Sequence, residues 1–70
     1  MRHPLPYAWA KSQRLLLEDD GERLVLWADA QAPRAALAEV MRLHAVDAVE
    51  LEASERLAQR IAQAYAGGES

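Results

Sequence analysis

The strongest constraint on the fold is the tetrapeptide Asp-Asp-Gly-Glu at residues 19–22, which separates two apolar runs. Residues 14–18 (RLLLE) precede this tetrapeptide and residues 23–28 (RLVLWA) follow it. An Asp-Gly pair between two such runs predicts a β-hairpin, because glycine adopts the positive φ that tight turns require. The second run is apolar at nearly every position. This is typical of a strand that is covered on both faces, or of one whose outer face contacts a partner.

Helical patterns lie on both sides of this hairpin. Pro6 suits the first turn of a short opening helix that carries Tyr7, Trp9 and Ala10. After the hairpin, Asp29 ends the strand and Pro33 fits the first turn of a second helix. Apolar residues recur in that helix at i, i+3, i+4 and i+7, which predicts one buried stripe. The stripe consists of Leu37, Val40, Met41 and His44.

The C-terminal third predicts a further strand and a last helix. Residues 46–53 (VDAVELEA) alternate, so that Val49 and Leu51 share one face of a half-buried strand. The opposite face carries Ala48, Glu50 and Glu52. Ser54 is a suitable N-cap for the last helix, and Glu55 is favourably placed against its dipole. The buried stripe of this helix consists of Leu57, Ile61, Ala64 and Tyr65.

These patterns predict an α+β fold with the order helix, strand, strand, helix, strand, helix. We expect a small two-layer sandwich with a three-stranded mixed sheet and a right-handed strand-helix-strand crossover, the hand that parallel strands prefer. The pattern leaves open whether the last strand lies beside the first or the second. The 70 residues provide for one domain. We place this domain at residues 1–66, with the start of a linker at 67–70, where Gly67 and Gly68 end the last helix.

Composition and charge exclude several classes of function. The formal net charge is −3 and the arginines are dispersed along the chain, so no basic stripe for nucleic acid is present. No apolar run approaches the roughly 20 residues that span a bilayer, and the first residues lack the apolar core of a signal peptide. The chain contains no cysteine, which fits a reducing compartment. We therefore expect a cytoplasmic domain.

The residue types that carry most enzyme chemistry form no catalytic pattern. His3 and His44 are not accompanied by the three or four converging ligands that a metal site needs. The acidic residues of the hairpin tip occupy a turn that is too short for a calcium loop. They are Glu18, Asp19, Asp20 and Glu22. The serines lack a neighbouring base and a nucleophile elbow, and no glycine-rich phosphate loop occurs. They are Ser12, Ser54 and Ser70. We expect no catalytic residue, metal or cofactor in this segment.

The large aromatic side chains are the remaining candidates for function. Tyr7, Trp9 and Trp27 are either core residues or contact residues for a protein partner. One small sheet does not easily enclose both indoles together with the leucines. A partly exposed tryptophan is a natural contact point for another protein.

The sequence also resembles a known family. LPYAWAKSQRLLLEDDGERLVLWAD is similar to the opening of the type II secretion ATPase, the E subunit, which commonly begins Leu-Pro-Tyr-x-Phe-Ala-Lys/Arg. Trp9 stands where that family usually has phenylalanine. The matching residues are Leu5, Pro6, Tyr7, Ala10 and Lys11. The segments DAQAPRAALAEVMRLH, AVELEAS and LAQRIAQAYAGGES resemble the later parts of the same domain.

This resemblance implies a first N-terminal domain that docks onto the cytoplasmic domain of the inner-membrane L subunit and holds the ATPase there. The ATP, magnesium and zinc sites of the family lie in later parts of its chain, which implies a segment without cofactors or ATPase activity. Residue type and expected exposure suggest a set of partner-binding candidates. They are Tyr7, Trp9, Lys11, Arg14, Trp27 and Arg34.

The alternative function is a regulatory domain that binds a nucleotide second messenger such as cyclic di-GMP. Related pilus ATPases carry a similar domain with repeated Arg-Leu-Gly-type motifs. The segment QRLLLEDD lacks that glycine pattern and has no second copy in the chain, which disfavours this alternative.

Overall fold

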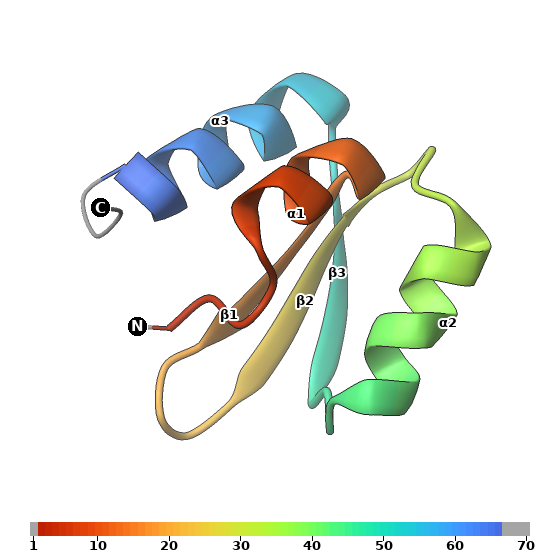
Figure 1. Ribbon diagram of the computed structural model, residues 1–70, viewed down its shortest axis with the longest axis vertical. Helices are drawn as coiled ribbons and strands as arrows, with labels where there is room; N and C mark the ends of the chain where they lie inside the picture. Colours follow the sequence, from red (N-terminus) through yellow and green to blue (C-terminus); the bar gives the residue numbers. More distant parts are fainter. Residues whose placement is uncertain (1, 67–70) are drawn as a thin grey trace.

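The structure is a computed structural model that describes residues 2–66 (Figure 1). Six elements follow one another along the chain. They are α1 (Tyr7–Gln13), β1 (Leu15–Asp19), β2 (Leu24–Asp29), α2 (Arg34–Leu43), β3 (Ala48–Glu52) and α3 (Ser54–Ala66). The predicted order of elements and the three-stranded mixed sheet are confirmed. The predicted linker at residues 67–70 lies outside the described residues.

The strand order, which the pattern left open, is β1-β2-β3. β1 and β2 pair antiparallel through the hairpin, and β3 pairs parallel to β2, with Leu26 opposite Val49. The N–H of Leu24 donates to the Asp47 carboxylate at 2.7 Å, and the N–H of Asp47 donates to the Leu24 carbonyl at 2.7 Å. These two bonds hold the start of β3 against the start of β2. β2 is therefore the central strand, in agreement with its nearly continuous apolar sequence.

The hairpin turn follows the prediction from Asp-Gly. Gly21 has φ +95°, a conformation that residues with a side chain rarely adopt. The Asp20 carboxylate accepts the N–H groups of Glu22 and Arg23 at 2.9 and 2.8 Å. The N–H of Arg23 and then that of Glu22 lower the pKa of Asp20 by stabilising its charged form. The acidic tip of the hairpin is thus a hydrogen-bonded turn.

Helices cover both faces of the sheet, so the prediction of two layers is wrong: the sheet is the middle layer of three. On one face, β1 and β2 pack against α2 and the buried Ala10 of α1. The buried residues of this cluster are Leu5, Ala10, Leu15, Leu17, Leu26, Ala28, Ala36 and Val40. On the other face, Leu16 packs against Leu57 and Ile61 of α3, and Trp27 lies at the border of this cluster. Because β1 and β2 are apolar on both faces, each face requires its own covering helix.

The opening helix starts one residue later than predicted and ends before β1. Pro6 has an extended backbone (ψ 143°) and is the N-cap residue of α1, and Pro33 is likewise the N-cap residue of α2. Arg14, which the apolar pattern placed in the first strand, has φ +61° and is the left-handed C-cap of α1. This turn redirects the chain from the helix into the strand. The Tyr65 hydroxyl donates to the Leu5 carbonyl at 2.5 Å and joins the two ends of the domain.

β3 differs most from the sequence prediction, because its apolar face is not covered. Val49 is 40% exposed and Leu51 is 69% exposed. Met41, predicted in the buried stripe of α2, is 48% exposed. The buried residues of α2, Ala36 and Val40, belong to the cluster formed with β1 and β2. α2 thus packs over the hairpin strands and leaves the same face of β3 open to solvent.

Candidate protein-interaction surfaces

Three of the predicted partner-binding residues line one groove between α1 and α3, which we call the α1 groove. Tyr7, Lys11 and Arg14 contribute to it, and its volume is about 390 Å³. Its other lining residues are Asp29, Ser54, Leu57, Ala58, Ile61 and Ala62. Tyr7 is exposed, and the Lys11 ammonium lies 5.8 Å from the centre of its ring. The groove therefore combines an aromatic ring, two cations and an apolar floor.

Asp29 is the buried polar group at the end of this groove, and sequence reasoning did not identify it as more than a strand end. Its carboxylate lies 3.8 Å from the Arg14 guanidinium and accepts the N–H of Gln31 at 2.8 Å. A hydrogen bond from the Ser54 side chain, followed by that from Gln31, lowers the pKa of Asp29. Ser54 is the first residue of α3 rather than its N-cap, and its side chain is used by Asp29. The carboxylate thus joins β2, the following loop and α3.

Trp9 lies away from this groove, on the side of α1 that faces α2. It is half-buried and lines a second depression of about 350 Å³. The other lining residues are Pro4, Leu5, Pro6, Glu39, Val40, Leu43 and His44. Trp9 and Tyr7 therefore belong to two different surfaces, although they are two residues apart.

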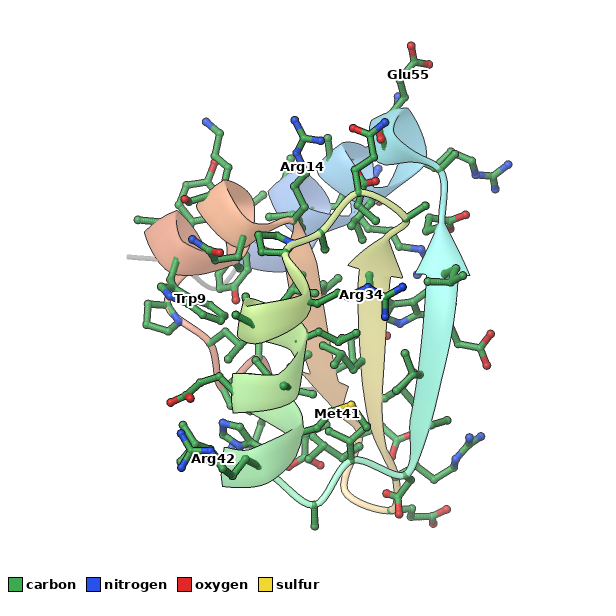
Figure 2. All side chains as sticks on the ribbon, turned by 90° about the vertical axis from the view of Figure 1, so that its right-hand side faces the viewer. Trp9, Arg14, Arg34, Met41, Arg42 and Glu55 are labelled. Atoms are coloured by element: carbon green, nitrogen blue, oxygen red, sulfur yellow. The ribbon has the colours of Figure 1, made fainter. Side chains whose placement is uncertain are left out.

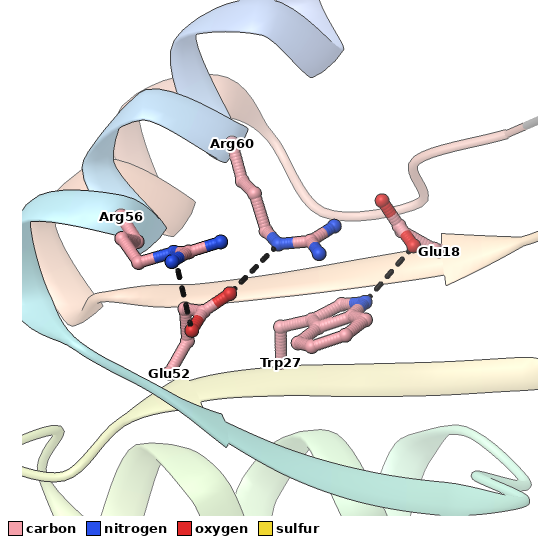
Figure 3. Close-up of polar contacts among 5 residues, drawn as sticks. All are labelled: Glu18, Trp27, Glu52, Arg56 and Arg60. Atoms are coloured by element: carbon pink, nitrogen blue, oxygen red, sulfur yellow. Dashed lines mark hydrogen bonds and ion pairs between the residues drawn. The ribbon is translucent and has the colours of Figure 1, made fainter.

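Trp27 is half-buried and engaged in contacts within the domain (Figure 3). Its indole N–H donates to the Glu18 carboxylate at 2.9 Å. The Arg60 guanidinium lies 3.9 Å from the centre of its ring, a cation–π geometry. Arg60 also donates to Glu52 at 3.1 Å, and Arg56 lies 3.9 Å from the same carboxylate. This cluster links α3 to all three strands.

The uncovered face of β3 is a surface that the sequence analysis did not identify. We define the β3 patch as Met41, Val49 and Leu51, three exposed apolar side chains of α2 and β3. Figure 2 shows Arg34 and Met41 on the side of α2 that faces β3. Arg34, one of the predicted contact residues, thus lies beside this patch. The signal in the sequence was a Met at the edge of a helical stripe that already contained enough apolar residues to cover two strands.

The described part of the chain, residues 2–66, shows neither a metal cluster nor a membrane span. In this range no three side chains of His, Asp or Glu gather in a way that suits a metal ion. Nor does any helix in this range have the length and apolar character needed to cross a membrane.

Comparison with protein families gives a match to the amino-terminal domain of GSPII protein E over residues 4–65. This range includes all six elements apart from the last residue of α3. The chain belongs to this family. A comparison of the sequence with curated proteins found no match.

Membership in the GSPII protein E family confirms the resemblance to the N-terminal domain of the type II secretion ATPase. The family is a non-catalytic part of that ATPase. In this member the predicted contact residues do not form one surface, since they lie in the α1 groove, in the second depression, in the Trp27 cluster and beside the β3 patch.

Proposed function

We propose that this chain is a protein-interaction domain that recruits the type II secretion ATPase to the cytoplasmic domain of the inner-membrane L subunit. The observation that carries the proposal is the family match over residues 4–65. The recruited ATPase is cytoplasmic and peripheral to the inner membrane through this partner. ATP, magnesium and zinc belong to the parts of the ATPase that do the mechanical work, and this domain contributes binding only.

The exposed apolar side chains support a docking role. Five large hydrophobic residues are exposed among the described residues, which is a substantial number for a domain of this size. They are Tyr7, Met41, Leu43, Val49 and Leu51. Exposed apolar groups that are rimmed by charges are typical of protein-binding surfaces. Charged residues surround them here, including Arg34 beside the β3 patch and Lys11 beside Tyr7.

The alternative, binding of a cyclic dinucleotide, is not favoured by the α1 groove. Lys11 and Arg14 are the cations there, and Arg14 already faces the buried Asp29 carboxylate at 3.8 Å. That carboxylate places negative charge at the point where a phosphate would bind.

A localisation experiment in cells tests the recruitment function. The chain is fused to a fluorescent protein and expressed in cells that lack the secretion system, with and without the L subunit. We expect diffuse fluorescence without the L subunit and fluorescence at the membrane with it. Fluorescence that stays diffuse in the presence of correctly inserted L subunit contradicts the proposal.

A further inference from the structure

We propose that the free edge of β3 is a strand-addition site for an extended partner segment in which apolar and basic side chains alternate. The inference rests on the proposed function, because it takes this segment to be part of the L-subunit cytoplasmic domain. It adds the surface, the mode of binding and the chemistry of the segment that is bound.

The first observation is that β3 has an unpaired edge. β3 pairs with β2 on one side, and within residues 2–66 nothing pairs with its other side. The opposite edge of the sheet is partly covered, since Arg2 and Asp19 of β1 exchange backbone hydrogen bonds at 2.7 and 2.9 Å. The residues of β3 (AVELE) include no proline or lysine, the residues that often protect an edge strand. Its outward N–H and C=O groups are therefore available to an added strand.

The second observation is the apolar face beside this edge. Val49 and Leu51 point to the face on which Met41 of α2 is also exposed. A strand added to β3 places alternate side chains next to Val49 and Leu51. Apolar side chains at those positions would cover the β3 patch, which α2 leaves open.

The third observation is the charge of the other face. Glu50 is exposed and forms no ion pair within the described residues, whereas Glu52 is already bound by Arg56 and Arg60. Opposite charges on adjacent strands stabilise their pairing, and like charges destabilise it. The neighbouring position of the added strand is therefore suited to a lysine or arginine opposite Glu50.

The same charge disfavours a second copy of this chain as the occupant. Antiparallel pairing of two β3 strands about their centre places Glu50 directly opposite the Glu50 of the other copy. The chain also has a net charge of −3, so two copies repel each other at longer range. A partner with the complementary charge is the occupant that this edge fits.

The test compares matched variants by isothermal titration calorimetry with the purified cytoplasmic domain of the L subunit. Leu51→Thr removes the apolar contact, and Leu43→Thr is its control, because Leu43 is similarly exposed (61%) but lines the depression beside Trp9. Glu50→Lys reverses the charge on the edge strand, and Glu22→Lys makes the same change at the exposed hairpin tip. We expect Leu51→Thr and Glu50→Lys to weaken binding at least tenfold and both controls to stay within twofold of wild type.

Hydrogen exchange of the complex provides a second readout that does not depend on mutation. Strand addition protects backbone N–H groups of residues 48–52 on binding, whereas docking of side chains alone does not form those bonds. Protection there together with the expected variant pattern supports the inference.

Failure of strand addition and failure of recruitment give different results. If wild type binds while Leu51→Thr and Glu50→Lys stay within twofold, or while β3 gains no protection, strand addition is wrong and recruitment stands. If wild type does not bind the L-subunit domain at tens of micromolar, both proposals fail. Concentration-dependent dimerisation in sedimentation that Glu50→Lys changes would identify a second copy as the occupant and overturn the inference.

Discussion

The exposure of Leu51 leads to a prediction about stability that can be worked out from the structure. Leu51 is 69% exposed, so about one third of its side chain is covered. Full burial of a leucine is worth about 1.5–3 kcal/mol, and the covered part therefore contributes about 0.5–1 kcal/mol. Threonine favours strands and recovers part of this amount. We expect Leu51→Thr to lower the free energy of unfolding by no more than about 0.5 kcal/mol.

Leu16, on the opposite face of the same sheet, is the comparison. It is fully buried against Leu57 and Ile61. Leu→Ala substitutions at such sites cost about 2–5 kcal/mol. A domain of this length has a total stability of about 3.5–10 kcal/mol at the usual value per residue. Leu16→Ala therefore removes a large part of the stability and lowers Tm by at least about 8 °C.

Urea unfolding followed by tryptophan fluorescence and far-UV circular dichroism measures both variants. The two probes report tertiary and secondary structure, and their agreement justifies a two-state analysis. If Leu51→Thr destabilises the isolated domain by about 2 kcal/mol or more, the cost of a buried leucine, Leu51 is covered in solution. The β3 patch would then not be a free surface.

Three further outcomes are expected. Trp27→Phe removes the hydrogen bond to Glu18 and weakens the contact with Arg60, so the free energy of unfolding falls by about 1–2 kcal/mol in urea; an unchanged urea midpoint would contradict the assigned contacts. The lowered pKa of Asp29 stabilises the fold above its ordinary value of 3.8, and this contribution disappears as the pH falls through the lower pKa of the folded state. The stability advantage of wild type over Asp29→Asn is therefore constant between about pH 5 and 7 and shrinks toward about pH 3, and an advantage that grows on acidification would refute this assignment. Cyclic di-GMP leaves Tm unchanged, whereas a ligand at 100 times its Kd would add about 2.7 kcal/mol and identify a second-messenger domain.

Local sequence signals predicted the elements well, because their physical causes are local. The Asp-Gly turn needs only the positive φ of Gly21, and the nearly continuous apolar run of β2 reflects its central position. The reversal at Arg14 was not predictable in the same way. A non-glycine residue in the left-handed conformation has no sequence signal, and the adjoining leucines made Arg14 look like part of the strand.

The surfaces were less predictable, since they depend on where helices dock over long distances. The apolar residues of β3 resembled a buried face, but their exposure is decided by the position of α2 over the other two strands. In the same way, the role of Asp29 depends on Ser54, which is 25 residues away in the chain and is brought close by α3. Residue type predicted Tyr7, Lys11 and Arg14 as candidates, but only the fold shows that they share one groove.

The account depends most directly on whether this domain binds the cytoplasmic domain of the L subunit. Isothermal titration calorimetry of the two purified wild-type domains measures this binding. We predict a saturable 1:1 isotherm with a Kd in the micromolar range or below, which corresponds to about 8 kcal/mol or more of binding free energy. The absence of binding heat at several temperatures, with both domains folded and at concentrations of tens of micromolar, would contradict the central claim.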